Sequence, residues 1–193
     1  EYLVQYPHGC TEQIVSAAFP QLYFGDISEM MQNDETGQSF ANANVQEAIR
    51  SIKMRQLYSG GLTLWESGGQ EHWWASAYAT HFLLEAKQAG YEVDKDLLNN
   101  LLDYLKSKVK QRNYVSYFYN RNENKRIAPK EMAYSLFVLA VANKSDISTM
   151  NYYKQRPEEL AIDSRFLLSA AYAIAGDKQK FREMLPSSFS GEE

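Results

Sequence analysis

A cysteine and a glutamine stand three residues apart near the start of the chain, Cys10 and Gln13, in the stretch PHGCTEQ. Cys10 is the only cysteine among 193 residues, so no internal disulfide can form. A thiolate is a strong nucleophile when it is accessible. Residues three apart on a helix lie over each other, so a thiolate at Cys10 would reach the Gln13 carboxamide. Attack with loss of ammonia would leave an internal thioester between Cys10 Sγ and Gln13 Cδ.

The residues around this pair favour the same chemistry. Gly9 allows a tight turn and a close approach of the backbone. Cys10 precedes a helical pattern, where the helix dipole favours negative charge. We expect Glu12 to interact with the same helix end, with a general-acid role as the less favoured alternative, and His8 either to tune the thiolate or to fill space. Composition alone would favour a buried structural thiol for Cys10.

The string from Pro7 to Gln13 resembles the thioester signature of the α2-macroglobulin and complement family, which reads Pro, Tyr, Gly, Cys, a small residue, Glu and Gln. His8 stands here in place of the tyrosine and Thr11 in place of the small residue. The preceding Tyr6 resembles bacterial members. A second stretch, 57–91, resembles the bacterial form at Gly60, Gly61, Leu62, Trp65, Trp74 and Tyr78.

This resemblance implies an α/α toroid, in which antiparallel helix pairs form two concentric layers, and a covalent protease trap rather than a turnover enzyme. In the intact protein a protease cuts a bait region, the molecule rearranges, and the exposed thioester acylates amines of the attacker. The implied partners are target proteases and the other domains of the same parent protein. The implied location is the periplasm or the cell surface.

The resemblance also bears on the preferred target. Family members that prefer hydroxyl groups carry a histidine on the toroid that attacks the thioester first, and Pro129 stands in its place here. We therefore expect this domain to react with amines directly. His72 is a candidate for a transacylation aid, although capping or packing is the favoured interpretation for it. We expect His81 to be a core histidine and the tryptophans, including Trp65, to be core aromatics.

Helical periodicity runs through most of the chain and indicates an all-α fold. Buried helices alternate with amphipathic ones, which independently suggests two layers, as in an α/α toroid or a helical solenoid. The expected helix boundaries are a break near Pro20, a cap at Asn44, ends at Ser59 and Gly90, caps at Asp94 and Asp177, and starts at Pro129 and Pro157. The stretch 114–120 alternates and is the one candidate strand.

We expect one thioester domain at 1–185 and a tail at 186–193. The chain does not begin with methionine and the family's domain is longer, so we expect a fragment with an incomplete toroid. A net charge of −4 argues against nucleic acid as a partner. No apolar run is long enough to insert into a membrane. The scattered histidines give no metal-ligand spacing and no phosphate-binding loop is visible, so no metal or cofactor is expected.

Two other functions stay open on the sequence. An α/α-toroid enzyme acting on an isoprenoid or a carbohydrate would need acidic residues gathered in a cavity, and the sequence shows no Asp-rich cluster on a helix. A helical binding module with a vestigial motif would keep Cys10 and Gln13 without the bond. Methylamine distinguishes the three functions, because only an intact thioester reacts with it to release the Cys10 thiol and to leave methylamine on Gln13.

Overall fold

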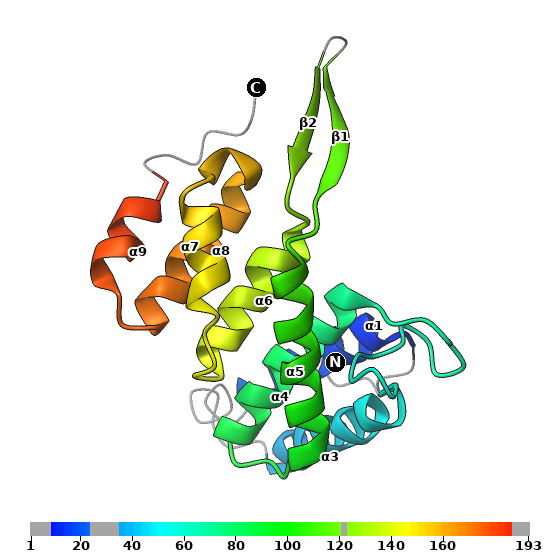
Figure 1. Cartoon of the computed structure of the whole chain (residues 1–193). Helices are drawn as coiled ribbons and strands as arrows, with labels where there is room; N and C mark the ends of the chain where they lie inside the picture. The colour runs from blue at the N-terminus through cyan, green and yellow to red at the C-terminus, as the bar shows by residue number, and fades with distance from the viewer. Residues whose placement is uncertain (1–8, 24–34, 121–122, 187–193) are drawn as a thin grey trace. The chain divides into compact units, whose positions relative to one another are not determined.

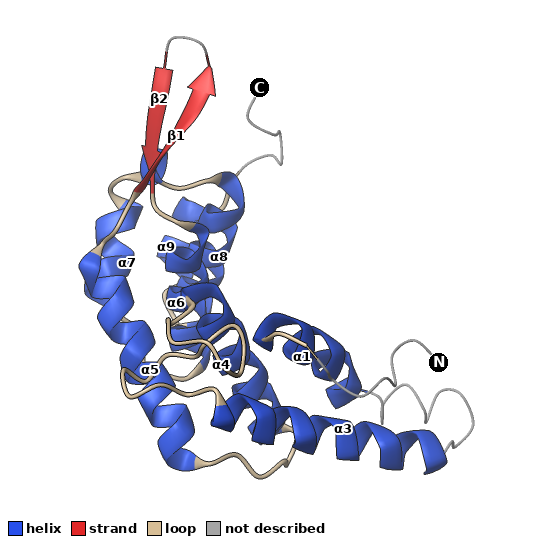
Figure 2. Ribbon diagram, turned by 90° about the vertical axis from the view of Figure 1, so that its right-hand side faces the viewer, coloured by secondary structure: helices blue, strands red, loops and turns tan. Residues whose placement is uncertain are grey.

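The structure is a computed structural model that describes residues 9–23, 35–120 and 123–186 (Figure 1). Most of these residues are helical, which confirms the predicted all-α fold. The exception is an antiparallel hairpin of β1 (Val115–Asn120) and β2 (Glu123–Ile127), drawn red in Figure 2, whose first strand lies in the predicted strand stretch. Contacts divide the chain into two compact units, residues 1–104 and 105–193. The concentric layers of a toroid and a single domain at 1–185 stay predictions.

The first unit is built around a short helix that carries the cysteine–glutamine pair. Its helices are α1 (Thr11–Ala18), the 3₁₀ turn η2 (Phe19–Tyr23), α3 (Glu35–Met54), α4 (Trp73–Gln88) and the first part of α5 (Lys95–Gln111). Helix α1 packs against both α3 and α4. The fully buried side chains between these helices include Ile14, Val15, Ala18, Val45, Ile52, Phe82 and Leu83. Burying each of the larger ones stabilises the fold by about 1.5–3 kcal/mol.

The helix ends of the first unit match the sequence patterns in part. Helix α1 gives way to η2 beside Pro20, and α4 ends just before Gly90, whose φ of 93° suits only glycine. The predicted cap at Asn44 is wrong, because α3 begins nine residues earlier, at Glu35. Asn44 is instead a buried residue within the helix, and its amide donates to Gln21 Oε1 at 3.0 Å. The helix also ends at Met54, before Ser59.

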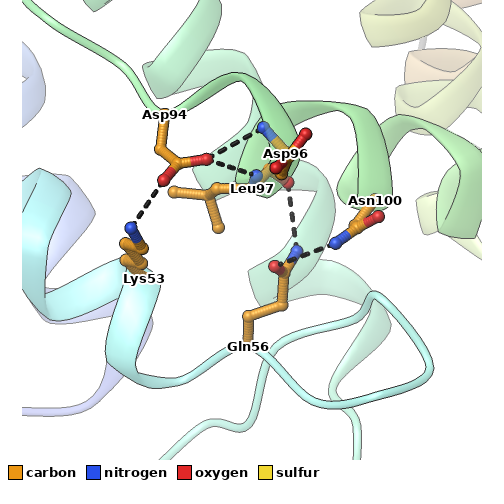
Figure 3. Close-up of polar contacts among 6 residues, drawn as sticks. All are labelled: Lys53, Gln56, Asp94, Asp96, Leu97 and Asn100. Atoms are coloured by element: carbon orange, nitrogen blue, oxygen red, sulfur yellow. Dashed lines mark hydrogen bonds and ion pairs between the residues drawn. The ribbon is translucent and has the colours of Figure 1, made fainter.

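Polar contacts join the end of α3 to the start of α5 (Figure 3). The Asp94 carboxylate caps α5 as predicted, because its Oδ1 accepts from the N–H groups of Asp96 at 2.8 Å and Leu97 at 3.0 Å. Its Oδ2 pairs with Lys53 Nζ at 2.5 Å. This bond to Lys53, with the two backbone bonds, lowers the pKa of Asp94 to about 2. Gln56 adds a bond from its Nε2 to the Leu97 carbonyl at 3.0 Å.

The second unit contains the end of α5, the hairpin and four further described α-helices, with α8 packed against both α6 and α9. Asp177 caps the last helix as predicted, and its Oδ1 accepts from the Lys180 N–H at 3.0 Å. Pro157 opens a 3₁₀ turn rather than α8, which begins at Ile162. The elements are α6 (Lys130–Val141), α7 (Ile147–Lys154), η3 (Pro157–Glu159), α8 (Ile162–Ile174) and α9 (Lys178–Met184). Among the described residues, no helix has the length and apolar character that crossing a membrane requires.

Candidate functional site

Cys10 and Gln13 meet at the first turn of α1. Cys10 is the N-cap residue, and its backbone N–H donates to Gln13 Oε1 at 3.0 Å. The two residues form a reciprocal capping box, so the Cys10 side chain in turn lies against the backbone of Gln13. The Cys10 side chain is buried, with 9% of the residue exposed. The carboxamide carbon of Gln13 is therefore held over the residue that carries the thiol, with its oxygen already on a hydrogen-bond donor.

Gly9 makes this arrangement possible by having no side chain. Its φ is 144°, a conformation that residues with a Cβ rarely adopt. A Cβ built there would collide with Gln13 Oε1 and would lie 3.1 Å from Gln13 Cδ. Gly9 is thus required both for the turn into α1 and for the space that the Gln13 carboxamide occupies.

Thr11 fixes the start of α1 to the segment that connects α3 and α4. Its N–H donates to the Leu64 carbonyl at 2.8 Å, and its hydroxyl donates to the carbonyls of Thr63 at 2.6 Å and Leu64 at 3.2 Å. Thr11 is fully buried, so these bonds are made away from water. The position that the family fills with a small residue is here a polar anchor.

The connecting segment, residues 55–72, is itself held by backbone bonds. Thr63 N–H donates to the Arg55 carbonyl at 3.1 Å, and His72 N–H donates to the Leu62 carbonyl at 2.8 Å. Gly61 lies against a ring of α5, because a Cβ there would come within 2.7 Å of Tyr104. The second stretch of family resemblance therefore forms the scaffold on which the Cys10 turn rests.

Glu12 and His72 lie next to each other beside this turn. His72 is the N-cap of α4, and its Nδ1 accepts from the Ala75 N–H at 3.2 Å. Glu12 Oε1 lies 3.8 Å from the same Nδ1. In the neutral ring this bond leaves the proton on Nε2, so the Nδ1 lone pair is used for capping. The favoured interpretation of His72 as a cap is confirmed, and its role as a transacylation aid stays a prediction.

The remaining predicted residues are His81, Trp65 and His8. His81 was predicted to be a core histidine but is half-buried: it packs edge-on against Phe19 at 5.2 Å, and desolvation lowers its pKa. Trp65 is not in the core as predicted: it is 56% exposed, in the segment between α3 and α4. His8 lies outside the described residues. The described residues contain no group of three or more His, Cys, Asp or Glu side chains that could hold a metal ion.

One residue at the site is not suggested by the motifs. Arg55, directly after α3, donates from its guanidinium to the Gly9 carbonyl at 3.2 Å. The sequence does carry a signal for it. The apolar stripe that runs through Ala48 and Ile52 continues at helical spacing to this position, so an arginine occupies the buried face of the pattern.

Comparison with known proteins identifies the family, although no family model matches the chain. Alpha-2-macroglobulin of Escherichia coli is 36% identical over 109 residues, which are 53% of this chain, and that of Xylella fastidiosa is 24% identical over 98% of it. A crystal structure of native E. coli alpha-2-macroglobulin from domain MG7 to the C-terminus superimposes with a TM-score of 0.75 and 26% identity over 95% of this chain. Salmonella alpha-2-macroglobulin reacted with methylamine gives 0.74 and 27% over 94%.

The chain belongs to the bacterial α2-macroglobulin family. It spans 6% of the length of the E. coli relative and 12% of that from Xylella. It also covers 29% of the E. coli crystal structure that begins at domain MG7 and 12% of the Salmonella one. What bacterial α2-macroglobulins share with this chain is therefore one region of a much larger protein.

Proposed function

We propose that this chain is the thioester domain of a bacterial α2-macroglobulin-like protease inhibitor, in which Cys10 and Gln13 form the internal thioester. The observation that carries the proposal is the hydrogen bond from the Cys10 N–H to Gln13 Oε1 at 3.0 Å. The proposal describes a covalent trap that reacts once, rather than an enzyme with turnover. Its setting is the periplasm or the cell surface, within a longer parent protein.

The hydrogen bond supports the proposal because it is placed where charge develops. When the Cys10 thiolate attacks Gln13 Cδ, the carbonyl oxygen becomes an oxyanion, and a fixed N–H donor stabilises it. The reacting groups also belong to one turn of helix, so the step is effectively intramolecular. The amide nitrogen takes up the thiol proton and leaves as ammonia. A C–S bond forms and a C–N bond breaks, and atoms balance.

Burial supports the storage of the bond. A thioester is an acyl group at high energy, and water would hydrolyse it if it were exposed. Cys10 is buried within the first unit, whereas Gln13 is exposed and Glu12 is half-buried in the first turn of α1. The sulfur side of the bond is thus shielded by the domain. We infer that another domain of the parent protein covers the acyl side until protease cleavage uncovers it.

Solved relatives suggest which molecules react with the proposed thioester. The Salmonella protein has been crystallised after reaction with methylamine, and E. coli structures represent forms activated by trypsin and by porcine elastase. We propose that the present domain likewise acylates amines of a protease, through lysine side chains. Pro129 in place of the histidine supports direct reaction with amines over hydroxyl groups.

The test compares two small nucleophiles on the same chain. Methylamine is expected to modify Gln13 and to release the Cys10 thiol, whereas methanol at equal concentration is expected to react far more slowly. Peptide mapping by mass spectrometry locates the adduct. The matched control is Cys10→Ser, which keeps the capping residue's size and cannot form a thioester. Methylamine on Gln13 in this control, or none on the wild-type chain, would contradict the proposal.

A further inference from the structure

Arg55 is a buried cation at the base of the thioester turn. Only 6% of its surface is exposed. Its guanidinium donates to the Ser51 carbonyl at 3.0 Å through Nη1 and to the Gly9 carbonyl at 3.2 Å through Nη2. Within the described part of the chain it makes no ion pair with a carboxylate, and its Nε has no hydrogen-bond partner.

Stability alone does not account for an arginine at this position. Taking a guanidinium out of water is costly, and the cost is offset only where charge partners and hydrogen bonds are complete. Among the described residues, the partners of the guanidinium are two neutral carbonyl groups. An apolar side chain would continue the stripe of α3 without that cost, and such replacements of buried charges are often neutral or stabilising. The role of Arg55 therefore lies in the backbone group that it binds.

Arg55 binds one end of the peptide group between Gly9 and Cys10, and the N–H at the other end activates Gln13. The Gly9 carbonyl and the Cys10 N–H belong to the same planar, rigid peptide unit. Arg55 binds the oxygen of this unit, and the N–H on its other side donates to Gln13 Oε1. A cation on the oxygen also polarises the peptide and strengthens its N–H as a donor. One rigid group thus connects the guanidinium to the reacting carbonyl.

We infer that Arg55 is a positioning residue for thioester formation, which it promotes by fixing and polarising the Gly9–Cys10 peptide whose N–H stabilises the oxyanion on Gln13. This inference rests on the proposed function. Arg55 touches neither the sulfur nor the carboxamide carbon. It acts through the peptide, so it changes the rate of bond closure and leaves the reacting groups themselves in place.

Closure of the bond can be followed from a defined starting point. Treatment with ammonia is the reverse of formation: ammonia adds to Gln13 Cδ, the C–S bond breaks, and the chain regains the Cys10 thiol and the Gln13 amide. After ammonia is removed, intact mass reports closure as the loss of one ammonia with time. The rate of this step is read on the folded chain, and thermal unfolding measures the stability of each variant separately.

We expect Arg55→Met to close about tenfold more slowly than the wild type, since removing an oxyanion donor outright costs about 10²–10³ in rate and here the donor is only loosened. Arg55→Lys keeps the charge but loses the planar fork, so its rate should lie between the two. Gln56→Met is the matched control. It loses the bonds to the Gly60 and Leu97 carbonyls and the bond from Asn100. Its side chain makes no described bond to the Cys10 turn, so it should close at the wild-type rate.

The outcomes distinguish this inference from the proposed function. A wild-type chain that neither carries nor re-forms the bond overturns both. A wild type that closes while Arg55→Met closes equally fast overturns only the role of Arg55, as does an equal loss of rate in Gln56→Met. If Arg55→Met does not fold, Arg55→Lys decides the matter, because wild-type closure in that folded variant also overturns the inference.

Discussion

Gly9→Ala is the substitution that separates the geometry of the site from the stability of the fold. The new methyl group would occupy the place of Gln13 Oε1, so the carboxamide must swing away and its bond with the Cys10 N–H must break. A residue with a Cβ at φ 144° adds backbone strain of about 1–3 kcal/mol. The lost hydrogen bond adds about 1 kcal/mol to that.

The chemical consequence is a slower closure of the bond. Without the Cys10 N–H on its oxygen, Gln13 loses the donor that stabilises the oxyanion, which slows closure by about 10²–10³. Gly90→Ala is the matched control, because Gly90 has a φ of 93° but a Cβ there would meet nothing within 4 Å. It carries backbone strain of about 1–2 kcal/mol without the collision.

The assay combines denaturant unfolding with closure followed by intact mass. Both variants are expected to be destabilised, Gly9→Ala by more because it also loses a hydrogen bond, and only Gly9→Ala is expected to close about 10²–10³ more slowly. Closure at the wild-type rate in Gly9→Ala would refute the reasoning, because it would show that the carboxamide does not need the place that the structure gives it. Equal loss of closure in Gly90→Ala would assign the effect to strain in general.

Three further predictions concern the scaffold. Thr11→Val should lower the free energy of unfolding by about 1–3 kcal/mol, because the buried hydroxyl and its bonds to the Thr63 and Leu64 carbonyls are lost, although the Leu64 carbonyl keeps the Thr11 N–H as a donor. Thr11→Ser keeps the hydroxyl and should lose less in the same denaturant titration. Gly61→Ala should cost about 1–3 kcal/mol by thermal unfolding, because its Cβ would lie 2.7 Å from the Tyr104 ring. Asp94→Asn should be less stable than wild type at neutral pH. The pKa of Asp94 is lowered from 3.8 to about 2 in the native state, so this difference is present above pH 3.8 and should vanish as the pH falls through about 2; a difference that persists below that range would contradict the pairing with Lys53.

The sequence predicts the site better than it predicts the elements that support it. Cys10, Gln13 and Gly9 follow from a motif of adjacent residues, and one helical turn brings such residues together whatever the rest of the fold does. The caps at Asp94 and Asp177 are local in the same way, because a side chain reaches the N–H groups two or three residues on.

Features that depend on distant partners are less predictable. Asparagine is a preferred N-cap residue, but the Asn44 amide donates to Gln21 of η2, and this contact accommodates Asn44 within a helix. Tryptophan is usually found in the core, yet Trp65 is exposed in the 55–72 segment. Arg55 is the instructive case. A charge on an apolar stripe is visible in the sequence, but its acceptor is 46 residues away at Gly9.

The intact mass of the wild-type chain, measured under denaturing conditions before any nucleophile is added, tests the thioester most directly. If Cys10 and Gln13 are joined, the chain is lighter by one ammonia than its sequence, and no thiol titrates at Cys10. A chain of full sequence mass, with a free Cys10 thiol and an unmodified Gln13 amide, would contradict the central claim.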